Sequence, residues 1–141
     1  DIRTAEYEPT LLRLTAADAL SRRNASVQTN IEQVGAMPLL VRLLKDTTVA
    51  VRKEAAATLA VLAVGHKQNQ ASAVRAGAIP PLITLLADSN ATIRQMAAGA
   101  LWALAANLGE QKGEATSILK TLLQDPTQEV RDMATKALNR L

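Results

Sequence analysis

The chain has 141 residues, 48% of them hydrophobic, and a formal net charge of +3. This length suits one core of ordinary domain size, so two independent domains are not expected. The absence of cysteine excludes disulfides and thiolate metal sites. One Trp and one Tyr cannot form the stacking platforms of a nucleic-acid binder, and no basic stripe accompanies them. Because the sequence has no signal-peptide pattern and no apolar stretch of about 20 residues, we expect no membrane span and a cytoplasmic or nuclear location.

Residues 1–30 are predicted to hold one helix. Leu and Ala recur at helical intervals from Leu11 to Leu20, which indicates an amphipathic helix. We interpret this segment as the last helix of an incomplete repeat. The chain is then expected to be an excerpt from a longer array, or the C-terminal end of one.

Residues 31–69 and 70–110 are predicted to be two units of one repeat. A shift of 42 positions superposes residues 35–63 on 77–105, and thirteen of the 29 pairs are identical. A period near 40 residues, filled with helical patterning, is typical of α-solenoids. In the second unit Gly77 precedes Pro80, as Gly35 precedes Pro38 in the first. This pattern permits a sharp change of direction just before the first turn of a helix.

Residues 111–141 are predicted to be a third, divergent unit. A further shift of 37 positions superposes residues 82–104 on 119–141, with identities that include Asp125, Arg131 and Met133. This unit has no Gly-Ala-x-Pro segment. Its relation to the other two lies in the leucine and alanine positions of its helices.

The second unit carries a specific resemblance. Its segment from Ala76 to Leu86, with Ile93-Arg94 and the run from Ala97 to Leu101, resembles an armadillo repeat. The first unit is similar, and the last is closer to the related HEAT pattern. The resemblance covers roughly residues 16–141 and implies an all-α fold, a right-handed alpha-alpha superhelix of about three repeats. It implies a scaffold for protein binding and not an enzyme.

Each unit also repeats an acidic and a basic position. An Asp is followed six residues later by an Arg, across a polar turn that ends one helix and starts the next. We expect the carboxylate and the Arg to tie that turn together, a structural role, because a catalytic pair has no reason to recur in every unit. The pairs are Asp46 with Arg52, Asp88 with Arg94, and Asp125 with Arg131.

The third helix of each unit is predicted to place one face in the core. Small residues beside that face, among them Ala56 and Ala98, should let neighbouring helices approach closely. The core positions are Val51, Ala55, Leu59 and Leu62, then Ile93, Ala97, Leu101 and Leu104, then Val130, Ala134, Leu138 and Leu141.

The resemblance places a binding groove opposite this core face. In armadillo proteins the third helices line a concave groove in which peptides or helices lie. By alignment the partner-binding positions are Arg22, Lys53, Ala57, Val61, Gln95, Gly99, Ala103, Asn107, Lys136 and Arg140, with Asp18 and Asp132 as acidic residues at the two ends. Trp102 lies beside this stripe, and two roles stay open for it: packing between the second and third units, or a contact at the groove edge.

The expected groove departs from one branch of the family. Importin-alpha-like repeats place a Trp and, four residues later, an Asn in the groove of each unit, where they hold a peptide backbone. Here those positions are Ala57 and Val61, Gly99 and Ala103, and Lys136 and Arg140. A groove floored by Ala, Gly and Val suits an amphipathic helix better than an extended basic peptide.

The sequence therefore predicts a protein-interaction module that binds a peptide or amphipathic helix of a protein partner. The alternative is a structural spacer, or a segment that self-associates through its terminal repeats. No nucleic-acid partner, cofactor or metal is expected. His66 is the only histidine, in a polar connection without neighbouring ligands, and no glycine-rich phosphate-binding spacing occurs.

Overall fold

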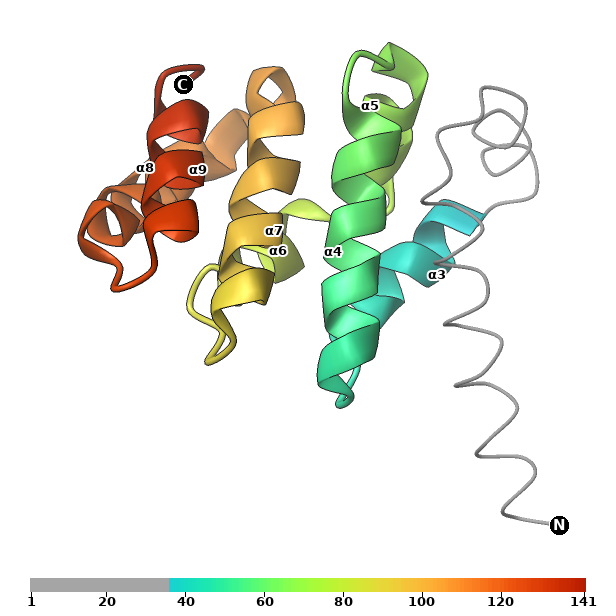
Figure 1. Cartoon of the computed structure of the whole chain (residues 1–141). Helices are drawn as coiled ribbons and strands as arrows, with labels where there is room; N and C mark the ends of the chain where they lie inside the picture. The colour runs from blue at the N-terminus through green and yellow to red at the C-terminus, as the bar shows by residue number, and fades with distance from the viewer. Residues whose placement is uncertain (1–35) are drawn as a thin grey trace, which may run out of the picture.

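The computed structural model of this chain describes residues 36–141, and that part of it contains helices and no strand. The predicted all-α fold is confirmed. Figure 1 shows the longest helices, α4, α7 and α9, standing side by side, with the shorter α3, α6 and α8 behind them. The helix predicted near residues 11–20 lies outside the described residues, as does Gly35.

The helices fall into three successive units. The first has α3 (Ala36–Leu43) and α4 (Val49–Ala63), and the second has α5 (Lys67–Arg75), α6 (Ile79–Leu85) and α7 (Ala91–Ala103). The third has α8 (Lys112–Thr121) and α9 (Gln128–Leu138). Short 3-10 turns lie at Ala105–Asn107, Gly109–Gln111 and Leu122–Gln124.

The turn from α5 to α6 depends on Gly77. Its φ of +85° lies in the left-handed region, which costs a residue without a Cβ little. The N–H of Gly77 donates to the carbonyl of Val74, and the N–H of Ala78 donates to the carbonyl of Ala73, both at 3.0 Å. This pair of bonds is the Schellman motif, which satisfies the last carbonyls of α5. Since Pro80 then lies in the first turn of α6, the predicted sharp turn is confirmed here.

Side chains of α5 also terminate the preceding helix. Asn69 is fully buried and donates from Nδ2 to the carbonyl of Leu62 at 2.9 Å. Gln70 donates from Nε2 to the carbonyl of Ala63 at 2.8 Å. His66, predicted to be a connecting residue, is the N-cap of α5, and its Nδ1 accepts the N–H of Asn69 at 3.0 Å. The connection between units thus binds both helices that it joins.

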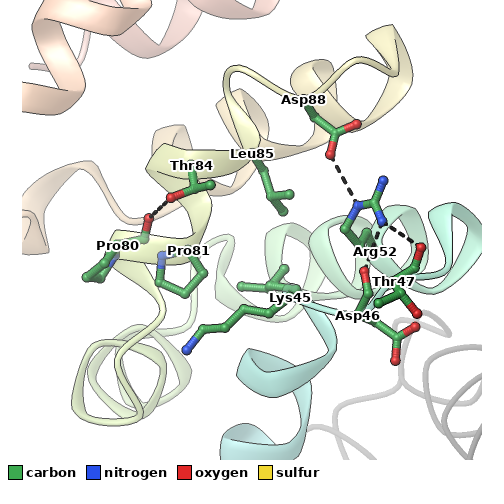
Figure 2. A pocket seen from close by; sticks show the side chains of 10 residues that line it. Lys45, Asp46, Thr47, Arg52, Pro80, Pro81, Thr84, Leu85 and Asp88 are labelled. Atoms are coloured by element: carbon green, nitrogen blue, oxygen red, sulfur yellow. Dashed lines mark hydrogen bonds and ion pairs between the residues drawn. The ribbon is translucent and has the colours of Figure 1, made fainter.

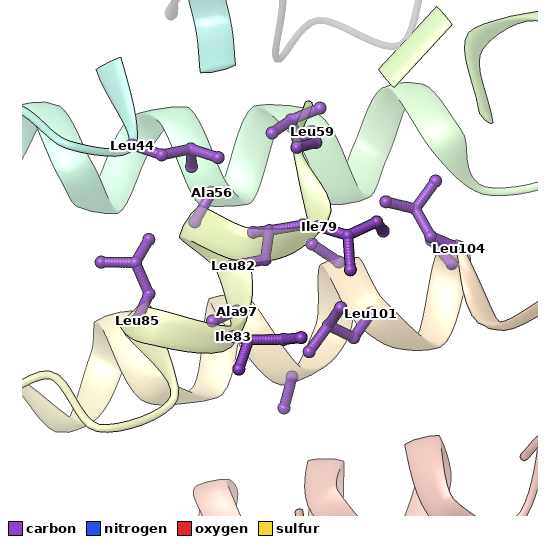
Figure 3. Packing of buried hydrophobic residues seen from close by; sticks show 14 of the residues in the cluster. Leu44, Ala56, Leu59, Ile79, Leu82, Ile83, Leu85, Ala97, Leu101 and Leu104 are labelled. Carbon is purple, nitrogen blue, oxygen red and sulfur yellow. The ribbon is translucent and has the colours of Figure 1, made fainter. Parts of the chain in front are cut away.

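The core runs through all three units. Figure 3 shows Ile79 and Leu82 of α6 between the two long helices, facing Leu59 on one side and Leu101 on the other. Ala56 and Ala98 have no exposed surface, and such small residues let α4 pack closely on α7 and α7 on α9. The predicted core face is buried in every unit, except that Leu138 and Leu141 of the last unit are half-buried.

Candidate functional site

Helices α4, α7 and α9 are the last helices of the three units and correspond to the third helix of an armadillo repeat. Their exposed sides form one surface, the third-helix face. Four of the predicted groove residues, Val61, Gln95, Gly99 and Trp102, gather there around a hollow of about 190 Å³. Its other lining residues are Ala60, Val64, Met96 and Met133. All three long helices therefore contribute to the hollow, and Val64 is the C-cap of α4. The hollow is lined almost entirely by apolar side chains.

Met133 forms part of this hollow from the third unit. Its Sδ and Cε would each lie 3.7 Å from a Cβ at Gly99, so the thioether of α9 reaches across to the backbone of α7. Val64, which ends α4, is 40% exposed at the hollow. The sequence prediction did not include these two residues. The identity of Met133 with Met96 at a shift of 37 was the signal that could have found the first, because equivalent positions of a solenoid lie on the same face.

Trp102 packs between the second and third units and also borders the hollow, so its contact with a partner stays a prediction. It lines the hollow and is half-buried. It also contacts the third unit, because Lys136 Nζ and Arg140 Cζ each lie 4.9 Å from the centroid of its ring. Arg140 Nη1 also donates to the carbonyl of Trp102 at 3.4 Å. The predicted groove residues Lys136 and Arg140 are therefore brought to the C-terminal side of the hollow.

The remaining predicted positions do not line the hollow. Lys53 and Ala57 are half-buried on α4, and Asn107 is exposed in a 3-10 turn. Ala103 is only 5% exposed, so its side chain offers a partner almost no contact area. Arg22 lies outside the described residues.

The Asp and Arg side chains brace the turns as expected, and two of the Arg side chains also contact the Asp of the next unit, which the sequence did not predict. Arg52 Nε donates to Asp88 of the next unit at 3.2 Å, as Figure 2 shows. Arg94 contacts Asp125 twice, from Nε at 2.8 Å and from Nη2 at 3.1 Å.

Within its own unit each Arg bonds to backbone instead. Nη1 of Arg52 and of Arg94 donates to the carbonyl of the Asp six residues earlier, at 2.9 and 2.8 Å. The carboxylate of that Asp accepts the N–H two residues later, for example Asn90 N–H on Asp88 at 2.9 Å. Both side chains do brace the turn, but separately. We call the resulting series of contacts the Asp–Arg ladder.

Asp125 is the most strongly held acid of the ladder, with a side chain that is 5% exposed. The hydrogen bonds from the Arg94 guanidinium lower the pKa of Asp125 below its ordinary value of 3.8. The N–H of Thr127 and the charge of Arg131 act in the same direction, while burial opposes them. Asp125 is therefore ionised at neutral pH, and its charge is balanced.

A second cavity of about 580 Å³ lies along the ladder, between the end of α3 and the start of α6. Figure 2 shows Arg52 and Asp88 on one side of it and Pro80 and Pro81 on another. Its polar groups are largely engaged, since Arg52 bonds as described and Thr84 Oγ1 contacts the carbonyl of Pro80 at 3.2 Å. We therefore interpret this cavity as a gap between two packed units and not as a binding site with free polar groups.

Two further properties hold for residues 36–141. No three His, Cys, Asp or Glu side chains lie close enough together to hold a metal ion. None of these helices has the length and apolar character required to cross a bilayer.

Comparison with known proteins gives the family. The armadillo/beta-catenin-like repeat matches residues 31–64 and 66–106, and the HEAT repeat matches residues 116–141. No curated protein matches the chain. The solved structures that resemble it include a designed armadillo repeat protein in complex with the peptide (KR)4. It is 28% identical with a TM-score of 0.82, and the match covers 96% of this chain and 58% of the other.

Two other designed structures agree. A second designed armadillo repeat protein is 31% identical over 89% of this chain and 55% of its own, with a TM-score of 0.76. A structure of computationally designed armadillo repeat proteins for modular peptide recognition is 29% identical, with a TM-score of 0.82. The match covers 95% of this chain and 58% of the other. This chain therefore spans little more than half the length of these structures. It belongs to the armadillo repeat family and ends in a HEAT-like unit.

Proposed function

We propose that this chain binds a peptide or an amphipathic helix of a protein partner along the third-helix face. The armadillo fold, and the similar designed protein that carries a bound peptide, support a general role as a protein-interaction repeat module. The observation that supports binding at the third-helix face is the apolar hollow, to which all three units contribute. A partner that fills it contacts three helices at once.

The size of the hollow supports a side chain as its occupant. At about 190 Å³ it is smaller than the roughly 300–1,000 Å³ of sites that enclose a drug-sized molecule. One or two aliphatic side chains of a larger partner fit this space. The armadillo scaffold is generally non-enzymatic, and we propose that this chain has no catalytic role and acts in the cytoplasm or nucleus.

Self-association through the terminal repeats is the alternative. Thr135 and Asn139 of the last unit are exposed, whereas Ala98, the equivalent of Thr135 in α7, is fully buried. Exposed polar residues weigh against stacking of a second copy on this end. Sedimentation velocity separates the two functions, because the alternative requires concentration-dependent assembly.

Two exposed valines near the ends of α4 provide a matched test. Val64 is 40% exposed and lines the hollow, while Val49 is 43% exposed and lies outside it. Peptides of about 12 residues, selected from a random displayed library on the intact chain, should bind the Val49→Arg variant normally and the Val64→Arg variant at least about tenfold more weakly. Equal binding to the two variants would refute recognition at this face, provided that both keep the wild-type circular dichroism.

A further inference from the structure

Within residues 36–141, no acidic side chain forms an ion pair with either of the two cations that contact Trp102. Lys136 lies on α9 and Arg140 just beyond it, four residues later, and both reach the same indole ring. The ion pairs between described residues are those of the Asp–Arg ladder, and neither cation takes part in them. The nearby acid on α9, Asp132, accepts a hydrogen bond from Gln128 Nε2 at 2.6 Å instead.

This arrangement leaves positive charge at one end of an apolar hollow. A cation over an aromatic ring at an exposed site gains little free energy, so the ring orients the side chain without neutralising its charge. Both cations are exposed, so an arriving carboxylate can reach them. Because the indole ring already holds the charged ends of both side chains, less side-chain entropy is lost when they bind an anion.

We propose that the segment bound on the third-helix face is acidic and aliphatic. One aliphatic side chain fills the hollow between Val61 and Met133, and an Asp or Glu about one helical turn away pairs with Lys136 and Arg140. This inference rests on the function proposed above and adds the chemistry of the partner. The expected ligand is opposite in charge to the (KR)4 peptide of the designed neighbour.

A helical ligand can present both features at once, because residues three or four positions apart lie on the same helix face, about 5–6 Å from each other. Trp102 borders both parts of the site, since it lines the hollow and supports the cations. A ligand with only one of the two features satisfies only half of it.

The test selects peptides of about 12 residues from a random displayed library on the intact chain, after depletion on the Val64→Arg variant. The enriched peptides should carry an Asp or Glu three or four residues from a Leu, Ile, Val or Met. For one labelled peptide, the Lys136→Gln/Arg140→Gln double variant should raise the Kd by about tenfold or more. The Lys120→Gln variant, which removes an exposed cation from α8, should leave the Kd unchanged.

Two further readings check the same site. Raising NaCl from about 100 to about 500 mM should weaken binding to the wild type strongly and to the double variant much less. Trp102 is the only Trp in the chain, so its emission should shift when the peptide binds. Circular dichroism and urea unfolding show whether the double variant keeps its fold.

The outcomes separate this inference from the proposed function. If the consensus peptides are basic or uncharged and bind the double variant with an unchanged Kd, the proposal of an acidic ligand is refuted. Recognition at this face would still stand. If depletion on Val64→Arg removes every binding peptide, no ligand uses the hollow, and both proposals fail. An acidic, aliphatic consensus that depends on the two cations supports both.

Discussion

The Asp–Arg ladder predicts two matched substitutions with different costs. Asp125→Asn removes the charge that accepts two hydrogen bonds from Arg94, at 2.8 and 3.1 Å. Asp88→Asn removes a charge that accepts one bond from Arg52, at 3.2 Å. In both variants the amide oxygen can still accept the backbone N–H two residues later, so the local turn is kept.

The expected magnitudes follow from these counts. A hydrogen bond to a charged group contributes about 1.5 kcal/mol, so Asp88→Asn, which loses one such bond, should cost about 1.5 kcal/mol. Asp125→Asn loses the bond from Arg94 Nε and weakens the bond from Nη2, which the neutral amide oxygen can still accept, and should cost about 2 kcal/mol. The low exposure of both acids, 5% and 10% of their side chains, keeps solvent from replacing the lost bonds. Asp132→Asn is the control, because this exposed residue should change stability by no more than about 0.5 kcal/mol.

Urea unfolding, followed by circular dichroism at neutral pH, measures the three free energies of unfolding. The order Asp125→Asn, then Asp88→Asn, then Asp132→Asn is required. If Asp125→Asn and Asp88→Asn both fall within about 0.5 kcal/mol of the wild type, the ladder is an array of surface ion pairs without energetic weight.

Three further predictions concern stability. Gly99→Ala should stabilise the chain by about 0.5–1 kcal/mol, because Gly99 is helical and its new Cβ meets only ordinary contacts. Gly77→Ala should destabilise it by about 1–2 kcal/mol, because Gly77 has a φ of +85°. Urea unfolding of the two variants should therefore give free-energy shifts of opposite sign. Asn69→Ala should cost about 1–2 kcal/mol and speed amide exchange near the end of α4, because it leaves the carbonyl of Leu62 unpaired; unchanged exchange there would contradict this. The pKa of Asp125 is lower in the folded chain than the ordinary 3.8, so its contribution is present above that value and is lost as pH falls below it; titration of unfolding should show a steeper acid loss in the wild type than in Asp125→Asn.

The helices and their core faces could be predicted from sequence because both depend on spacing along the chain. Leu59 and Leu101 are equivalent in the 42-residue shift and are both buried, and Gly77 adopts the positive φ that its place before Pro80 requires. A repeat strengthens such inference, since each unit tests the pattern that the others show.

The contacts between units could not be predicted in the same way. The sequence drew attention to the Asp six residues before Arg94, but the carboxylate that Arg94 contacts belongs to Asp125, 31 residues later. Likewise the hollow needs Met133, which a stripe drawn along each helix at intervals of four does not include. Such pairings depend on how one helix is rotated and shifted against its neighbour, which periodicity within a helix does not determine.

The ladder also gives the stack a direction. In the second unit, Asp88 faces backward to Arg52 and Arg94 faces forward to Asp125, so one unit carries both complementary halves of the junction. A head-to-tail contact of this kind does not close on itself, and it can recur between any two units joined in the same order. Duplication or removal of a whole unit can therefore preserve every junction, which allows the length of the array to change without a new interface.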